Sequence, residues 1–394
     1  MAETIVNPVT IDELESLARQ KLPKNVYDYY ASGADDQKCL IRNRAAFDRI
    51  LIRPRVMVDV SKVDTSTRLF SVEYPFPIAF APSAMQKLAH PQGEESVARA
   101  AQRLGVNMTI SSQSTTSLED IASLMPNTPD GPERWFQLYV TENSALSTPL
   151  IKRAANAGYT ALVITVDTPL LGNRINERKT PLVLPSNLHL ANYKGSEKTK
   201  ADNYRPSQER QLLDAPTAAQ AKQVVRDAGG SIHSSSLTWT ETISWLRSAT
   251  SMKIILKGVM TEEDAELAVK HGVDAIVVSN HGGRQLDSAP ATIEALPSIA
   301  AATKGQIPIL FDGGVRHGSD VFKAIALGAD LVLVGRPVLW GLAYDGQIGV
   351  ELVANILERE LSRTMALAGI PNIRGIDKKF LGLRRRDGFG IARL

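Results

Sequence analysis

His281 and Arg284 are the residues whose types and spacing point most directly to chemistry. They lie three positions apart in residues 279–287, directly after the apolar run 275–278, which is typical of a buried parallel strand. An imidazole accepts a proton near neutral pH, and a guanidinium binds a carboxylate through two parallel hydrogen bonds. The pair therefore predicts an enzyme that holds an acid and removes a proton beside it. The alternative is a loop histidine whose polar atoms are satisfied by the backbone.

Asp167 is the acid that we expect to assist His281. It follows another apolar run, residues 161–165, so the carboxylate and the imidazole both stand at the ends of predicted strands. A buried carboxylate orients an imidazole and stabilises the imidazolium that forms when the ring takes a proton. Such a pair suits removal of an alcohol proton. The alternative is that Asp167 only caps the helix that follows it.

Lys257 ends a further apolar run and has two enzymatic interpretations that the residues alone leave open. Its amine can form a Schiff base, as in an aldolase built on a barrel. Its ammonium can instead place positive charge beside the N1–C2=O edge of a reduced flavin. The structural alternative is a lysine that is paired with a carboxylate.

Two glycine-rich segments late in the chain predict a phosphate site. One contains Asp312, Gly313, Gly314 and Arg316, and the other contains Gly335 and Arg336 just before a helical pattern. Exposed glycine amides, a helix N-terminus and arginines are what a phosphate dianion requires. The site implies a phosphorylated substrate or a phosphorylated cofactor such as FMN. The alternative is two tight turns with surface arginines.

The elements that must position these residues follow a regular rhythm. Short apolar runs alternate with longer segments of helical spacing, which implies a parallel sheet in an α/β fold. Eight such units predict a closed (β/α)₈ barrel, whose strand ends meet on one face, where active sites form. An open doubly wound sheet is the alternative. The runs are residues 78–81, 107–110, 135–138, 161–165, 253–256, 275–278, 307–311 and 331–334.

The rest of the chain is expected to surround this barrel, which we assign to residues 76–370. Residues 1–75 predict an N-terminal helical cap, in which Thr10 and Glu13 form a capping box and a second helix begins at Pro23. Residues 184–238 are a long polar excursion after the fourth strand, either a mobile lid or a loop without a role. Residues 371–394 form a C-terminal tail.

Composition restricts the functional classes. The 394 residues carry a net charge of +3, from 45 basic and 42 acidic side chains, which argues against nucleic-acid binding. The single cysteine, Cys39, excludes a disulfide framework, and no apolar run is long enough for a membrane span. No metal site is expected. The last residues, Ala392, Arg393 and Leu394, approximate a peroxisomal address; otherwise a cytoplasmic location is expected.

These motifs resemble those of the FMN-dependent α-hydroxy acid oxidase/dehydrogenase family, and within it glycolate oxidase most of all. The resemblance covers nearly the whole chain and is weakest over residues 184–238 and after residue 370. It rests on residues 27–33 (YDYYASG), 81–86 (APSAMQ), 136–139 (FQLY), 279–287 (SNHGGRQLD) and 312–316 (DGGVR). It implies oxidation of a 2-hydroxy acid to a 2-oxo acid, followed by reduction of O2 to H2O2, in a homotetramer or homo-octamer.

The resemblance also implies a role for each site residue. His281 is the base, Asp167 its partner, and Tyr139 a catalytic and substrate-binding residue. Tyr29, Arg174 and Arg284 bind the carboxylate and hydroxyl of the substrate, and Gln113 faces its far end. The residues expected to hold FMN are Pro82, Ser83, Ala84, Ser111, Gln137, Thr165, Lys257, Ser279, Asp312, Gly313, Gly314, Arg316, Gly335 and Arg336.

One departure from the family concerns the substrate. Gln113 stands where glycolate oxidase has tryptophan, so a longer or more polar substrate than glycolate is expected. Three alternatives stay open: an FMN enzyme of a larger ring, amine or hydroxy acid, a Schiff-base aldolase through Lys257, and a silent phosphate-binding barrel. Ala84 matches the oxidases, whereas relatives with glycine at that position tend toward oxygenase chemistry.

Overall fold

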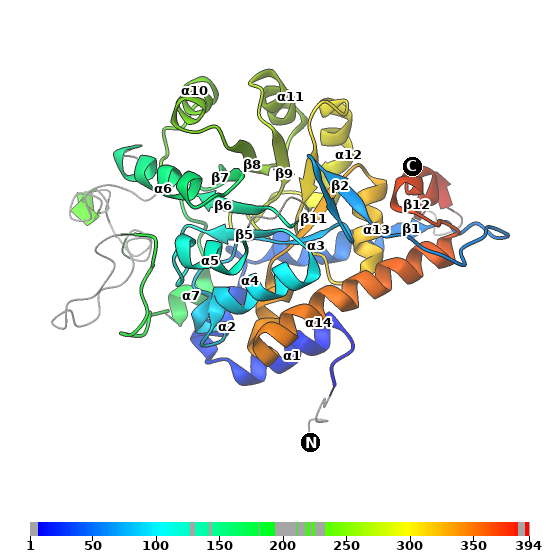
Figure 1. The fold of residues 1–394 in the computed structure, drawn as a ribbon, viewed down its shortest axis with the longest axis horizontal. Helices are drawn as coiled ribbons and strands as arrows, with labels where there is room; N and C mark the ends of the chain where they lie inside the picture. Colours follow the sequence, from blue (N-terminus) through cyan, green and yellow to red (C-terminus); the bar gives the residue numbers. More distant parts are fainter. Residues whose placement is uncertain are drawn as a thin grey trace.

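Eight parallel strands close into a barrel, as the sequence predicts (Figure 1). The computed structural model describes residues 7–126, 131–141, 144–180, 182–193, 233–384 and 391–393, with residues 211, 217, 219, 220, 223 and 224. The barrel closes between the last and first strands, where Val332 pairs with Ile78 and Val334 with Phe80. The strands are β4 (Ile78–Phe80), β5 (Met108–Ser111), β6 (Arg134–Leu138), β7 (Ala161–Thr165), β8 (Lys253–Val259), β9 (Ala275–Val278), β10 (Ile309–Phe311) and β11 (Leu331–Val334).

One strand is longer than predicted. β8 continues to Val259, and its register against β9 shifts between Lys257 and Val259. Lys257 therefore lies within the strand and not at its end. Gly258 adopts φ +116°, and a Cβ there would lie 2.7 Å from the Cβ of Asp167, so this irregularity lets β8 pass close to the Asp167 side chain.

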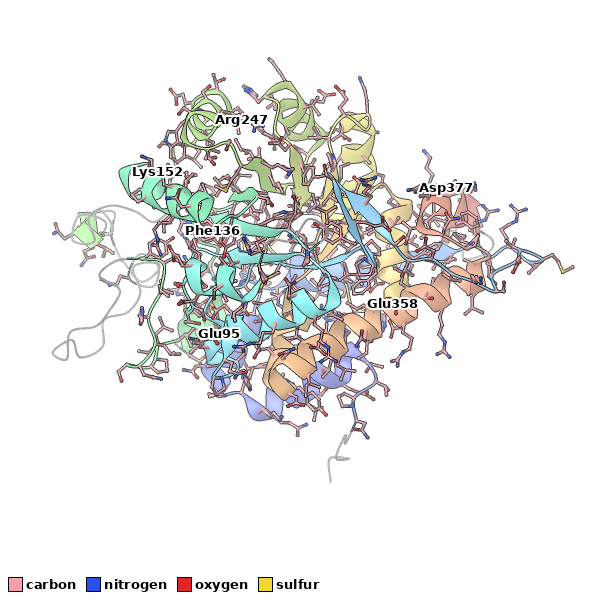
Figure 2. The ribbon with its side chains drawn as sticks, viewed as in Figure 1. Glu95, Phe136, Lys152, Arg247, Glu358 and Asp377 are labelled. Carbon is pink, nitrogen blue, oxygen red and sulfur yellow. The ribbon has the colours of Figure 1, made fainter. Side chains whose placement is uncertain are left out.

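Alternate residues of the strands point into the barrel and toward the helices. On β6, Trp135 belongs to the cluster inside the barrel and Phe136 to the cluster between strands and helices. Phe136 lies deep in the molecule, whereas Lys152 and Arg247 lie at the periphery (Figure 2). The hairpin of β2 (Thr67–Leu69) and β3 (Val72–Tyr74) adds Leu69 and Tyr74 to the inner cluster and thereby closes the N-terminal end of the barrel. The cavity that holds the predicted site residues therefore lies at the opposite end, at the C-terminal ends of the strands.

A helix follows each strand and covers the barrel (Figure 1). The last one is broken at Asp345 and Gly346, where the backbone leaves helical geometry. A short helix, α7 (Ile175–Lys179), precedes the excursion. The covering helices are α4 (Gly93–Leu104), α5 (Leu118–Leu124), α6 (Ser144–Asn156), α10 (Trp239–Ala249), α11 (Glu262–Lys270), α12 (Thr292–Thr303), α13 (Gly318–Ala326) and α14 (Arg336–Ala368).

The N-terminal helices pack onto the rim of the barrel. They are α1 (Ile11–Lys21), α2 (Lys24–Ala31) and α3 (Lys38–Asp48). The Thr10–Glu13 capping box is present, and Pro23 is the N-cap residue of α2, which begins at Lys24, one position after the predicted start. The Cys39 amide donates to Asp287, and Asn43 and Asn280 exchange side-chain hydrogen bonds. The cap therefore holds the segment that carries His281.

The strand that follows α3 and the C-terminal end of the described chain meet in a small sheet that the sequence did not predict. β1 (Ile50–Ile52) pairs antiparallel with β12 (Leu381–Arg384), which pairs with β13 (Ile391–Arg393). Ala392 and Arg393 of the expected targeting signal lie in β13, and Leu394 lies outside the described residues. Most of the predicted excursion also lies outside them. Among the described residues, no helix is both long and apolar enough to span a membrane.

Candidate active site

The predicted site residues meet in one cavity of about 480 Å³ at the C-terminal ends of the strands. All of them line the cavity except two, which lie behind its wall. Asp167 is hydrogen-bonded to His281, and Ser279 is hydrogen-bonded to Lys257. The residues at the wall are Tyr29, Pro82, Ser83, Ala84, Ser111, Gln113, Gln137, Tyr139, Thr165, Arg174, Lys257, His281, Arg284, Asp312, Gly313, Gly314, Arg316, Gly335 and Arg336.

Two contacts fix the position of His281 at the wall of the cavity. Its Nδ1 lies 3.0 Å from Oδ1 of Asp167, and its backbone amide donates to Ser279 at 3.2 Å. The residue adopts φ +57°, which turns the chain sharply after β9 and aims the ring into the cavity. Burial lowers the pKa of His281 although the Asp167 carboxylate raises it, so the neutral ring predominates at pH 7.

Asp167 carries the charge that the pair requires. Burial raises the pKa of its carboxyl, but His281 and Lys257 outweigh this effect, and the pKa lies below its ordinary value. The carboxylate is therefore ionised at pH 7.

Tyr139 stands on the cavity side of His281. Its hydroxyl lies 3.5 Å from Nε2 of His281, and burial, with the nearby Asp167 carboxylate, raises the pKa of the phenol. The phenol thus stays protonated and can donate a hydrogen bond to a ligand placed beside the imidazole.

Two guanidinium groups, of the buried Arg174 and the partly buried Arg284, form the positive end of the cavity. Arg284 donates to the carbonyl oxygens of Tyr29 and Ser32 and lies 5.2 Å from the centre of the Tyr29 ring. Burial and the neighbouring Arg174 lower the pKa of Arg284 to about 10, so it remains a cation at pH 7. Within the described part of the chain, the buried Nε of Arg174 has no hydrogen-bond partner. An anionic ligand between these groups would satisfy it.

The other end of the cavity suits a phosphorylated flavin. Lys257 donates to Ser279 at 2.9 Å and lies 3.3 Å from Oδ2 of Asp312, whose buried Oδ1 has no partner among the described residues. An unused acceptor of this kind fits a ligand hydroxyl, and the lysine supplies positive charge beside it. Gln137 donates to Thr165 at 3.0 Å, which fixes the amide on the wall between them.

The glycines and arginines predicted to hold a phosphate lie together at the wall of the cavity. Gly313 and Gly314 adopt φ +108° and +81°, and a Cβ on Gly314 would lie 2.0 Å from the carbonyl oxygen of Asn43. Gly335 precedes the N-terminus of α14, and the buried Arg316 lies beside these glycines. Arg336 donates to the carbonyl oxygens of Tyr30, Ser32 and Gly282, so it also ties the cap to the His281 turn. These residues fit FMN, with its phosphate at the glycines.

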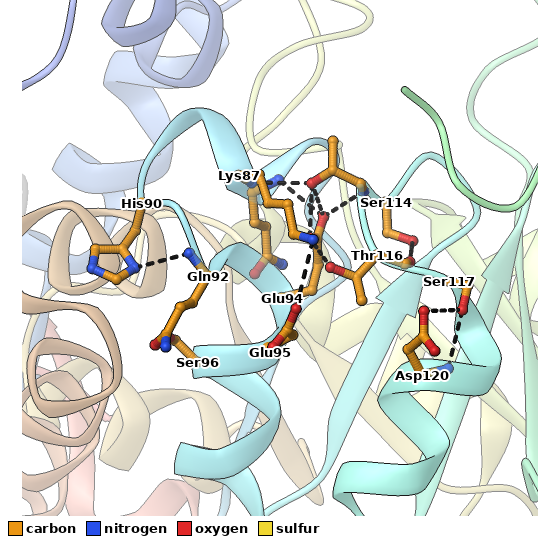
Figure 3. A network of polar contacts seen from close by, with 12 residues as sticks. Lys87, His90, Gln92, Glu94, Glu95, Ser96, Ser114, Thr116, Ser117 and Asp120 are labelled. Atoms are coloured by element: carbon orange, nitrogen blue, oxygen red, sulfur yellow. Dashed lines mark hydrogen bonds and ion pairs between the residues drawn. The ribbon is translucent and has the colours of Figure 1, made fainter. Parts of the chain in front are cut away.

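Glu94 is a positioning residue that the sequence did not reveal. Its carboxylate is fully buried at the start of α4 and accepts hydrogen bonds from the amides of Gln86 and Thr115 and the hydroxyls of Thr115 and Thr116 (Figure 3). It therefore joins the loop of Ser83 and Ala84 to the loop of Gln113. No local pattern around Glu94 distinguishes it from an ordinary acid in a first helical turn.

Glu94→Ala is expected to weaken both the fold and cofactor binding. Two buried amides would lose their acceptor, which costs at least about 2 kcal/mol in the free energy of unfolding. Denaturant titration and the Kd for FMN measure the two effects. Glu95→Ala is the matched control on the same turn, because the ion pairs of Glu95 within the described part of the chain are with the partly exposed Lys87 and Arg99. Equal effects of the two variants would contradict the role of Glu94.

His233 is the second residue that the sequence did not single out. It lies on the return from the excursion, where the Ser234 amide donates to Val140 at 2.9 Å, and it lines the cavity next to Tyr139. An isolated histidine in a polar segment carries no spacing signal. Apolar side chains of Leu171, Leu182, Val183, Leu184 and Leu190 form the neighbouring wall.

Fold and site together define a barrel enzyme whose cavity has a glycine-rich turn region, a His–Asp pair and two arginines at its wall. Comparison with known proteins identifies the family to which this enzyme belongs. Residues 18–383 match the model of the FMN-dependent dehydrogenase family. The chain is 46% identical to glycolate oxidase of Spinacia oleracea, over 94% of this chain and 95% of that protein. It is 48% identical to glycolate oxidase 3 of Arabidopsis thaliana, over 93% and 94%.

Solved structures lead to the same family. A mandelate oxidase variant with (S)-mandelic acid superposes with a TM-score of 0.81 at 37% identity, over 95% of this chain and 98% of that one. A variant of a chimera of (S)-mandelate dehydrogenase gives a TM-score of 0.82 at 33% identity, over 95% and 99%. The chain belongs to the FMN-dependent dehydrogenase family, and the expected family, barrel fold and FMN cofactor are confirmed.

Proposed function

We propose that this protein is an FMN-dependent oxidase that converts an (S)-2-hydroxy acid into the 2-oxo acid and reduces O2 to H2O2. The observation that carries the proposal is the His281–Asp167 pair: His281 lines the same cavity as the two arginines and the glycine-rich turns, and Asp167 bonds to it from behind the wall. The similarity to glycolate oxidases and mandelate oxidase supports the substrate class.

Binding of the acid follows from charge. Its carboxylate pairs with Arg174 and Arg284, since both guanidinium groups line the cavity and one nitrogen of Arg174 lacks a partner in the described structure. Tyr29, against which Arg284 packs, adds a wall and a phenolic hydroxyl at the same end. Orientation by a two-arginine clamp places the carbon that bears the hydroxyl near His281.

Proton transfer is assigned to His281 at the cavity wall and to Asp167 behind it. Nε2 of His281 takes the hydroxyl proton of the acid, with the Tyr139 phenol donating a hydrogen bond beside it. The carboxylate of Asp167 stabilises the imidazolium that results. Loss of the carbon-bound hydrogen completes the oxidation, and bound FMN would supply the two-electron acceptor that this loss requires.

The direct test is anaerobic mixing of the flavin-loaded protein with a panel of 2-hydroxy acids. Loss of flavin absorbance with one acid and its return with air, together with formation of H2O2, would support the function, substrate and acceptor. A loaded protein that no 2-hydroxy acid reduces would refute the proposal and favour the alternative of a larger ring or amine substrate. The apolar wall near Leu184 and Leu190, and Gln113 in place of tryptophan, make acids larger than glycolate the first to test.

Arg284→Met is expected to raise KM by about 10- to 100-fold, because it removes charge-assisted hydrogen bonds to the carboxylate worth about 1.5–3 kcal/mol. Arg284→Lys keeps the positive charge and should lose less. Steady-state kinetics over the acid panel measures the effect. A KM unchanged in Arg284→Met would remove Arg284 from the clamp.

Two other functions have less support. A Schiff-base aldolase needs a free amine at Lys257, but this group is bonded to Ser279 and paired with Asp312. A silent phosphate-binding barrel would have no use for the buried His281–Asp167 pair. Borohydride trapping with a carbonyl substrate tests the aldolase. Flavin reduction that is the same in the wild type and in His281 variants would favour the silent barrel.

The cellular setting is also a proposal. Ala392 and Arg393 are consistent with peroxisomal targeting, which suits an enzyme that forms H2O2, and a fluorescent fusion with and without the final three residues tests it. A homotetramer or homo-octamer is expected from the resemblance, and light scattering of the purified protein measures the assembly.

A further inference from the structure

A second cavity of about 240 Å³ adjoins the site cavity. It lies under α10 and beside the ends of β7 and β8. Its apolar lining comes from Val140, Val166, Leu237, Ile243, Leu256 and Val259. Nothing in the catalytic arrangement described above uses this space.

Three residues line both cavities: Tyr139, Thr165 and His233. Thr165 ends β7, where it accepts a hydrogen bond from Gln137, and Tyr139 stands beside His281. Both are thus fixed by the barrel frame and the reaction. These three residues form the partition between the two cavities. His233 is the member that lies on the segment that returns from the excursion, so it can vary without disturbing the barrel.

The His233 ring is uncharged and forms part of the partition between the two cavities. It is buried, and it packs edge-on against Tyr139 with ring centres 4.6 Å apart and an angle of 76° between the planes. Burial, with His281 and Arg174 nearby, lowers its pKa to about 4, although Asp167 opposes this, so the ring is neutral at pH 7. A neutral ring packed in this way can close an apolar chamber.

We propose that His233 is a specificity-determining residue, whose side chain closes the second cavity and thereby limits the length of the substrate side chain. The inference rests on the proposed function for its substrate class. Truncation of His233 would join the two cavities. The alkyl chain of a straight-chain acid could then extend from the carboxylate clamp, past Tyr139, into the apolar chamber under α10. Each methylene buried there contributes about 0.8 kcal/mol, or roughly fourfold in affinity.

Equilibrium binding of 2-oxo acids to the FMN-loaded protein tests this without turnover. Kd values for 2-oxopropanoate and 2-oxooctanoate are measured by the change in flavin absorbance, in the wild type, His233→Ala and His233→Phe. His233→Ala is expected to shift the preference at least tenfold toward the eight-carbon acid, whereas His233→Phe, which keeps a ring in the partition, should leave the preference within about twofold. His189→Ala is the matched control, because His189 lies on the excursion outside both cavity linings.

A preference in His233→Ala within twofold of the wild type would overturn the inference, provided that circular dichroism and flavin content show an intact protein. Should His233→Ala fail to fold, His233→Val and His233→Leu give the same comparison with graded side-chain volume, and an equal preference in both would overturn it. Turnover of 2-hydroxy acids by the wild type is measured in parallel. Altered binding without any turnover would refute the proposed function and leave the partition intact.

Discussion

His281→Asn is expected to lower kcat by about 10²- to 10⁴-fold while FMN stays bound, because a positioned general base contributes about that much to a proton transfer. Asparagine tolerates the φ of +57° that this position requires and keeps a polar side chain toward Asp167, so the variant removes the base without straining the turn. Rapid mixing with the best acid of the panel measures flavin reduction directly, apart from reaction with O2.

The pH dependence of kcat/KM is a second test of the role of His281. The pKa of His281 lies below its ordinary value of 6.5 because burial disfavours the imidazolium. In the free enzyme, the neutral base therefore predominates at pH 7, and kcat/KM should fall only as the pH drops through a value below 6.5. His189→Ala serves as the control for loss of a histidine. A His281→Asn enzyme that keeps wild-type flavin reduction and the same acid limb would contradict the assignment of the base.

Asp167→Asn is the prediction with the next largest expected effect, a loss in kcat of about 10²-fold or more with little change in FMN binding. The carboxylate bonds Nδ1 of His281 at 3.0 Å, and its charge stabilises the imidazolium that forms when the substrate proton is taken. An amide keeps the shape of the site and removes that charge. Steady-state and rapid-mixing kinetics measure the loss.

The direction of the pH effect distinguishes this role from a structural one. Because Asp167 raises the pKa of His281, its neutralisation should lower that pKa further and move the acid limb of kcat/KM to lower pH. Asp120→Asn, on the exposed first turn of α5, is the matched control. An Asp167→Asn variant with reduced kcat and an unmoved acid limb would make Asp167 only a packing residue.

Glu94 and His233 show why a sequence reveals only part of such a site. His281, the proposed base, and the glycines proposed to hold the phosphate stand in local patterns, since each follows a strand whose apolar run is visible, and strand ends of a barrel converge. Glu94 acts through the loops after β4 and β5, and its partners Gln86 and Thr115 are brought together only when the two strands pair. His233 meets Tyr139 across 94 positions of chain. Contacts of this range depend on the folded backbone and leave no local spacing.

By itself the sequence determined the eight-stranded barrel, because alternation of apolar runs with helical periodicity depends on neighbouring residues alone. It also determined the residues that gather at the rim, from His281 to Arg316, because topology brings strand ends together. The tertiary structure decided the rest: the sheet between β1 and β12, the continuation of β8 past Lys257, the hydrogen bonds of Glu94, and the partition at His233. These features arise from pairing and packing between distant segments, whose geometry exists only after the chain has closed on itself.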